Sequence, residues 1–209
     1  MKFFLIIISV TAIIIIGTVH AMAIEEVKYK VVKKDNHFEV RDYSTHIVAE
    51  TVVEENMEDA GNIAFKKLFG YISGDNRSRD KISMTAPVSQ QKKGEKIKMT
   101  APVTQAPDKD SWVVSFMMPS GYTMETLPAP ENLEVTLRQI PARRMAVVGY
   151  SGFWSEKGYL RYKAELESWI HRMGFTAVGV PIWARYNPPF MPWFLRRNEI
   201  LIPIDVGSG

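Results

Sequence analysis

The chain has 209 residues, 46% hydrophobic and 23% charged, a composition typical of a globular domain rather than a disordered chain or a multi-span membrane protein. Its 26 Lys and Arg against 23 Asp and Glu give a formal charge of +3, too small to indicate a nucleic-acid-binding face, so we expect no nucleic-acid partner. The absence of cysteine excludes disulfides, thiolate nucleophiles and cysteine-bound iron–sulfur or zinc sites.

The N-terminal residues have the pattern of a secretory signal peptide. Lys2 is followed by an apolar run over 3–16 and then by small residues with the cleavage pattern Val19-x-Ala21. The sequence therefore predicts a signal peptide over 1–21. The alternative is an uncleaved anchor in the inner membrane, although the run is slightly short of the ~20 apolar residues that span a bilayer. Either way, we expect the domain to lie in the periplasm or another extracytoplasmic compartment.

Residues 24–205 show the patterns of one α+β domain, followed by a flexible tail at 206–209. A first helix is predicted from the capping residue Asn56 to Ile72, and a second begins after Ser155 and ends at Gly174, because apolar residues recur there with helical spacing. Predicted strands are 27–32, 38–43, 47–53, 111–118, 133–140, 144–150, 178–186 and 199–204.

A short repeat occupies the middle of the chain. The eight residues 81–88 recur almost unchanged at 96–103, and the connection between the copies is polar and contains Gly94. This arrangement predicts the two arms of a β-hairpin. Because proline has no N–H to donate to a strand ladder, we expect each arm to end or reach a sheet edge near Pro87 and Pro102.

A weaker and longer repeat relates the two halves of the chain. Residues 40–43 correspond to 137–140 at an offset of 97, which also places Ala49 on Ala146. Each half continues as strand, turn, helix and strand, and either half alone would leave an apolar sheet face open. The sequence therefore predicts a pseudo-twofold, distorted antiparallel β-barrel or sheet flanked by two helices, with a cleft between the halves.

The repeated motif Lys-Ile-x-Met-Thr-Ala-Pro-Val is distinctive, and it occurs with four further motifs. These are Phe-Glu-Val-Arg-Asp-Tyr at 38–43, Gly-Tyr-Ser-Gly-Phe at 149–153, Tyr-Asn-Pro-Pro at 186–189 and Arg-Asn-Glu-Ile at 197–200. With them the chain resembles the SOUL haem-binding protein family over residues 25–205, which in turn is similar to GyrI-like small-molecule-binding domains. The resemblance implies a distorted β-barrel with two helices that binds a tetrapyrrole, with haem as the expected cofactor, in an apolar cleft.

The resemblance leaves the iron ligand open. Some family members carry a histidine where this chain has Asp42, and a carboxylate does not replace an imidazole there. We therefore expect haem binding to be dominated by apolar burial rather than by strong fixed ligation. The candidate ligands to test are His46, Met84 and Met99, each of which also has an ordinary structural interpretation in a strand or a packed core.

Two segments are predicted to form the walls of the cleft. They are the first helix, 56–72, and an aromatic, proline-rich segment, 183–194, which could instead pack over the barrel or contact a membrane surface or a partner protein. The wall candidates are Phe65 and Phe69 from the helix and Trp183 and Tyr186 from the aromatic segment. The cations available for the haem propionates are Lys66, Lys67, Arg196 and Arg197.

These features favour an exported haem- or tetrapyrrole-binding protein, for binding, transport or buffering, and not an enzyme. Residues 149–153 lack the final glycine of G-x-S-x-G, and the sequence has neither H-E-x-x-H nor a P-loop. One alternative is a GyrI-like small-molecule-binding protein or hydrolase, in which a carboxylate such as Glu199 does acid–base work. Another is an envelope protein that binds a partner through the aromatic segment. The sequence assigns no oligomeric state.

Overall fold

The computed structural model describes residues 24–79 and 94–205. The predicted signal peptide, the first copy of the short repeat with Met84, and the C-terminal tail lie outside these residues. The helical elements are α2 (Met57–Ser73), α3 (Glu156–Arg172) and the 3₁₀ turn η1 (Trp193–Leu195). Strands are β1 (Tyr29–Asp35), β2 (Phe38–Tyr43), β3 (His46–Val53), β4 (Asn76–Arg77), β5 (Val103–Asp108), β6 (Ser111–Met117), β7 (Ala129–Pro130), β8 (Thr136–Ile140), β9 (Arg143–Tyr150), β10 (Thr176–Ala177), β11 (Ile182–Arg185) and β12 (Asn198–Asp205).

Both helices begin at the capping residues that the sequence predicts. The side chain of Asn56 accepts hydrogen bonds from two backbone N–H groups in the first turn of α2, and Ser155 accepts one at the start of α3. Gly74 and Gly174 follow the helix ends with φ of 125° and 72°, a region that residues with a side chain rarely adopt. No helix in 24–79 or 94–205 has the length and hydrophobicity to cross a bilayer.

The main sheet is antiparallel, and its strand order is β1-β2-β9-β12-β11-β5-β6-β3-β8, with β10 paired to β12; β4 and β7 form a separate pair. After β1 the order is symmetric about the β11–β5 contact. Each half of the chain supplies two strands, a helix and two more strands. The offset of 97 also holds in register, because Arg41 pairs with Met145 just as Arg138 pairs with Val48. The predicted pseudo-twofold α+β fold is confirmed.

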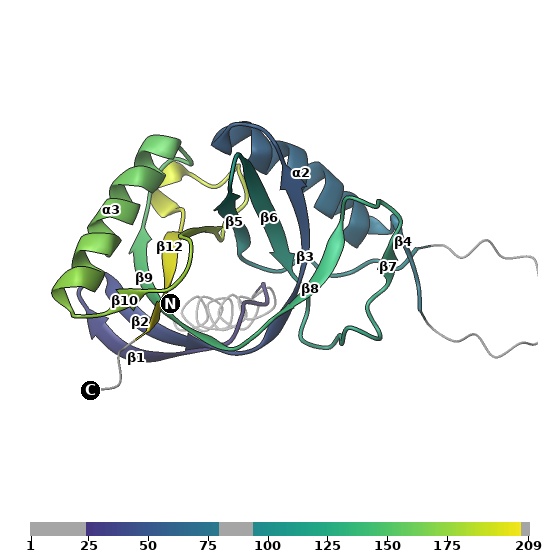
Figure 1. Ribbon diagram of the computed structural model, residues 1–209. Helices are drawn as coiled ribbons and strands as arrows, with labels where there is room; N and C mark the ends of the chain where they lie inside the picture. The colour runs from purple at the N-terminus through teal and green to yellow at the C-terminus, as the bar shows by residue number, and fades with distance from the viewer. Residues whose placement is uncertain (1–23, 80–93, 206–209) are drawn as a thin grey trace, which may run out of the picture.

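The sheet is curled, and α2 and α3 both lie on its outer side (Figure 1). Alternate side chains of β2, β9 and β12, such as Val40, Ala146 and Ile202, pack with α3 in one core cluster, whereas α2 covers β3 and β6 in a second. The side chains that alternate with these along the strands, including Tyr43 and Leu201, point to the other side of the sheet and form a smaller cluster on its inner face. The molecule therefore has two distinct sides at which a ligand could bind.

The hairpin prediction is wrong for the second copy of the short repeat. Residues 94–102 form no strand, and Ala101 makes only an isolated bridge with Glu26. The segment instead lies beside the end of α2. Ile97 is buried there, and its N–H donates a hydrogen bond to the carbonyl of Ile72. Strand β5 begins only at Val103, directly after the proline.

Three predicted strands have different bounds, and the first of them, expected over 27–32, lies at Tyr29–Asp35. The strand expected over 133–140 begins at Thr136, because Asn132 accepts a hydrogen bond from the backbone of Glu134 in a turn. The strand expected over 178–186 is shorter, since only β11 (Ile182–Arg185) lies within that span and β10 ends before it, at Ala177. The partner strand β12 carries Pro203 between its pairings with β10 and β11, and this residue has no N–H with which to continue the ladder.

Candidate ligand-binding site

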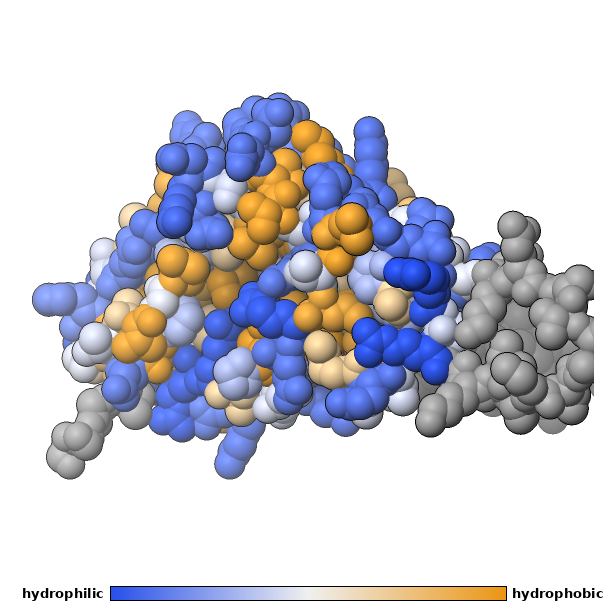
Figure 2. Space-filling view, turned by 45° about the vertical axis from the view of Figure 1, so that its right-hand side comes forward, coloured by the Kyte–Doolittle hydropathy of each residue, from blue (hydrophilic) through white to orange (hydrophobic). Residues whose placement is uncertain are grey.

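A groove of about 730 Å³ lies on the outer side of the sheet, over the β11–β5 contact where the two halves meet. Its walls come from α2, from the segment before β5 and from the segment after β11. These walls are mostly apolar. On the face of the molecule that Figure 2 shows, hydrophobic residues are exposed among hydrophilic ones. The lining residues are Ile24, Gly61, Asn62, Phe65, Lys66, Met99, Thr100, Ala101, Val103, Trp154, Arg185, Tyr186, Asn187, Pro188, Pro189 and Phe190.

The groove brings together several residues that the sequence predicts as haem contacts. Phe65 and Lys66 lie on α2, Met99 lies before β5, and Tyr186 follows β11. Phe69, one turn after Phe65, stacks on its ring at a centroid distance of 5.7 Å but is not among the lining residues. The helix and the start of the aromatic segment thus face one another across a single apolar space.

Other predicted residues lie elsewhere. Trp183 is only 1% exposed and packs in the core beside Tyr159. Asp42 forms a two-pronged ion pair with Arg144. The remaining predicted cations already have partners: Lys67 pairs with Glu134, and Arg196 donates to the carbonyls of Met191 and Pro189.

His46 lines a different cavity, of about 500 Å³, on the inner face of the sheet. Its Nδ1 lies 2.9 Å from the carbonyl oxygen of Ser44. Burial, together with the nearby charge of Arg143, lowers the pKa of the imidazole. His46 and Met99 therefore line separate cavities, on opposite sides of the sheet.

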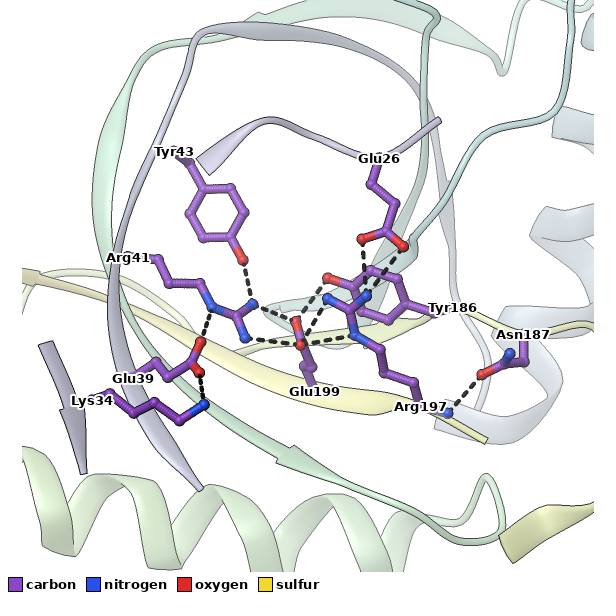
Figure 3. Close-up of polar contacts among 9 residues, drawn as sticks. All are labelled: Glu26, Lys34, Glu39, Arg41, Tyr43, Tyr186, Asn187, Arg197 and Glu199. Carbon is purple, nitrogen blue, oxygen red and sulfur yellow. Dashed lines mark hydrogen bonds and ion pairs between the residues drawn. The ribbon is translucent and has the colours of Figure 1, made fainter. Parts of the chain in front are cut away.

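A cluster of buried charges also lies on the inner face (Figure 3). The carboxylate of Glu199, 2% exposed, accepts hydrogen bonds from Arg41 at 2.9 and 3.1 Å, from the Tyr186 hydroxyl at 2.7 Å and from Arg197 at 3.1 Å. Burial alone would lower the pKa of Arg41, but its contacts with Glu199 raise it. Burial and the charge of Glu199 both raise the pKa of Tyr186 well above its usual value.

The cluster continues to the surface and balances its own charge. Arg197 also forms an ion pair with Glu26 at 2.9 Å. Arg41 forms an ion pair with Glu39, and Glu39 forms another with Lys34. Three carboxylates and three cations are therefore joined in one network (Figure 3). Arg197, predicted as a propionate partner, is engaged within the protein and is not among the residues lining the groove.

Arg185 is a groove residue that the sequence analysis did not identify. It lies on β11, two residues after the buried Trp183, so both side chains point to the helix side of the sheet. Its guanidinium lies 4.9 Å from the Trp183 ring and 5.4 Å from the Trp154 ring. Nη2 donates to Gln105 at 3.2 Å, whereas the buried Nε has no hydrogen-bond partner among the described residues.

The electrostatics of Arg185 are unusual for an arginine. Burial lowers its pKa to about 10, and Tyr150 offsets this only in part. The side chain therefore still carries a positive charge at neutral pH. A charged residue two positions after a buried tryptophan, on the same face of a strand, is the sequence signal that could have identified it.

Solved structures with the same fold are distant in sequence. The C-terminal domain of EcmrR aligns with a TM-score of 0.58 at 11% identity, covering 85% of this chain and 98% of that one. EcmrR in a complex with DNA aligns with a TM-score of 0.56 at 12% identity, over 80% and 57% of the two chains. A hydrolase from Listeria innocua aligns with a TM-score of 0.53 at 11% identity, over 83% and 94%. At these identities the likeness shows the fold alone.

The family is shown by the sequence itself. No curated protein matches the chain. The family model described as SOUL heme-binding protein, however, matches residues 24–203, which is nearly all of the described chain. This chain is therefore a member of the SOUL haem-binding protein family.

Proposed function

We propose that the protein binds haem or a related tetrapyrrole in the groove between α2 and residues 185–190. The observation that carries this proposal is the groove itself: its volume of about 730 Å³ lies in the range of small-molecule sites, ~300–1,000 Å³. Its apolar walls suit a flat macrocycle, and Lys66 and Arg185 are cations that suit the propionates. The residues present thus fit the cofactor that the family name implies.

The proposal assigns the main part of the binding free energy to apolar burial. Met99 is the candidate iron ligand that lines the groove, and a thioether is a weak ligand compared with an imidazole. His46 lines the cavity on the other side of the sheet, so binding in the groove does not use it. Met84 lies outside the described residues.

A haemin titration followed by the Soret band tests the proposal. We expect wild-type binding in the micromolar range, about −8 kcal/mol. His46→Ala and Met99→Leu, which removes the sulfur but keeps the volume, should each change the affinity by less than about tenfold, or ~1.4 kcal/mol. Absence of binding at tens of micromolar would overturn the function. A hundredfold loss with a changed spin state in His46→Ala would instead place haem on the inner face.

We also propose that the protein is not an enzyme. The hydrolase alternative requires a carboxylate that is open to a substrate, and Glu199 is the buried candidate on the last strand. Its oxygens are occupied by two arginines and a tyrosine hydroxyl. We expect no turnover on a panel of esters; turnover that is lost in Glu199→Gln, with the fold retained, would favour the hydrolase.

Export and a binding, transport or buffering role complete the proposal, supported by the N-terminal pattern of Lys2, the apolar run and Val19-x-Ala21. Mass spectrometry of the protein from its native host should find a chain that begins near Met22, or an intact chain in the membrane fraction. An intact chain in the cytoplasmic soluble fraction would contradict both the cleaved and the anchored alternatives.

Contact with a membrane surface is part of the same proposal. Four large apolar side chains beside the end of the aromatic segment are exposed, namely Phe153, Trp193, Phe194 and Leu195. Such a group is consistent with insertion into the interface of a bilayer. We expect the protein to co-sediment with lipid vesicles and Trp193→Ser to reduce this fraction. Equal recovery of the two proteins without vesicle binding would contradict the contact.

A further inference from the structure

We propose that Arg185 is the carboxylate anchor of the groove, so that the groove selects apolar ligands that carry a carboxylate over neutral or cationic ligands of the same shape. This inference rests on the proposed function, because it assumes that the groove is the binding site. It goes further in naming the chemical group that the site recognises and the residue that recognises it.

The first support is the lack of a counter-ion. A buried charge without a partner costs several kcal/mol, so arginines inside proteins are normally paired. Arg41 follows this rule through Glu199. Arg185 does not: its one hydrogen-bonded side-chain partner is the neutral amide of Gln105, and its buried Nε has none among the described residues.

The second support is the charge of the groove. Its charged lining residues, within the described part of the chain, are Lys66 and Arg185, and none of the lining residues is an aspartate or glutamate. The groove therefore attracts an anion and repels a cation. Lys66 is exposed to water on α2, whereas Arg185 is partly buried, so a carboxylate gains more from Arg185, where the dielectric screening is weaker.

The third support is the fixed position of the guanidinium. It lies near two tryptophan rings, and α2 has Gly61 at the point of closest approach, where a Cβ atom would lie 3.0 Å from both terminal nitrogens. The glycine lets the guanidinium pack directly against the helix. A planar guanidinium that is held in place and has donors to spare suits two-point binding of a carboxylate.

Protoporphyrin IX and its dimethyl ester test the inference without iron, because they differ only in the two carboxylates. We expect the wild-type protein to bind the diacid at least tenfold more tightly than the ester, measured by porphyrin fluorescence. Arg185→Met should weaken diacid binding at least tenfold, leave ester binding within threefold, and so remove the preference. Arg185→Lys should retain part of it.

Arg143→Met is the matched control. Arg143 lies on the inner face, and burial lowers its pKa also, but it does not line the groove. We expect this variant to keep the full preference. A preference that survives in Arg185→Met, or is lost in Arg143→Met, would overturn the inference. Far-ultraviolet circular dichroism verifies the fold of each variant, and Arg185→Lys serves as the test if Arg185→Met does not fold.

A second ligand pair separates this inference from the haem function. Cis-parinaric acid and its methyl ester are apolar, fluorescent and unrelated to porphyrins. If neither porphyrin binds but the fatty acid binds in an Arg185-dependent way, the carboxylate anchor stands and the haem function fails. If both porphyrins bind equally, the haem function stands and the anchor fails. If no carboxylated ligand binds, both fail.

Discussion

Arg41 on the inner face and Arg185 on the helix side are two arginines with different electrostatic surroundings. On the inner face, Arg41 is held by Glu199, and its pKa is raised although burial acts to lower it. On the helix side, Arg185 has no carboxylate partner among the described residues, and burial lowers its pKa to about 10. Burial acts to lower the pKa of both guanidinium groups, but only Arg41 has a carboxylate partner that reverses the effect. A saturated ion cluster stabilises the fold, whereas an unsaturated charge in an apolar groove remains available to a ligand.

The largest expected effect is the loss of the acid at the centre of the inner cluster. Glu199→Gln keeps the shape but leaves Arg41 and Arg197 without their shared counter-charge. We expect the free energy of unfolding to fall by about 3–5 kcal/mol, measured by urea denaturation. A loss below about 1 kcal/mol would show that water or another acid balances these arginines.

The matched change on the helix side should have a much smaller effect on stability. Arg185→Met removes a hydrogen bond to Gln105, but it also removes an unpaired buried charge. Because the two contributions oppose one another, we expect the free energy of unfolding to change by less than about 1 kcal/mol in the absence of ligand. A loss as large as that of Glu199→Gln would mean that Arg185 is structurally paired.

Tyr186 belongs to both regions, since its ring lines the groove and its hydroxyl donates to Glu199. Tyr186→Phe removes the hydrogen bond and keeps the ring. We expect it to lower the free energy of unfolding by about 1.5 kcal/mol, as for a hydrogen bond to a charged group, and to leave haemin affinity within threefold. A tenfold loss of affinity would show that the hydroxyl contacts the ligand.

The smallest expected effect is the pH dependence due to His46. Its pKa is lower in the folded protein than in the unfolded chain, because burial and Arg143 disfavour the charged imidazole. The unfolded chain therefore takes up this proton first as the pH falls below about 6.5. We expect stability to decline from there, until the folded form is protonated as well. The decline should be smaller in His46→Asn, and an identical pH profile would contradict it.

Much of the fold could be predicted from the sequence, because the sequence contains a repeat that relates its two halves. The offset of 97 residues predicted that Arg41 and Arg138 occupy equivalent positions, and the strand registers agree. Periodicity does not show how a short segment is used, however. The second copy of the Met-Thr-Ala-Pro motif reads as a strand, but it lies along the end of α2, where Ile97 finds both its apolar contacts and its backbone partner.

Only part of the binding site could be predicted from the sequence. A helix with excess aromatic residues and an apolar segment without helical pattern indicated two walls, and the structure brings Phe65, Met99 and Tyr186 to one groove. Sequence reasoning selected Arg197 as a cation and missed Arg185. Arg197 is neutralised by Glu199, two residues further on, and by Glu26, 171 residues away, whereas Arg185 has no such partner among the described residues. Residue type and spacing do not reveal such pairing.

The central claim is that the ligand lies on the helix side of the sheet. The most direct measurement is a haemin titration of two variants that each place a tryptophan at an exposed position in one cavity. Asn62→Trp fills the groove, and Val180→Trp fills the cavity on the inner face. We expect Asn62→Trp to weaken binding at least tenfold and Val180→Trp to leave it within threefold. Loss of binding in Val180→Trp with normal binding in Asn62→Trp would contradict the claim.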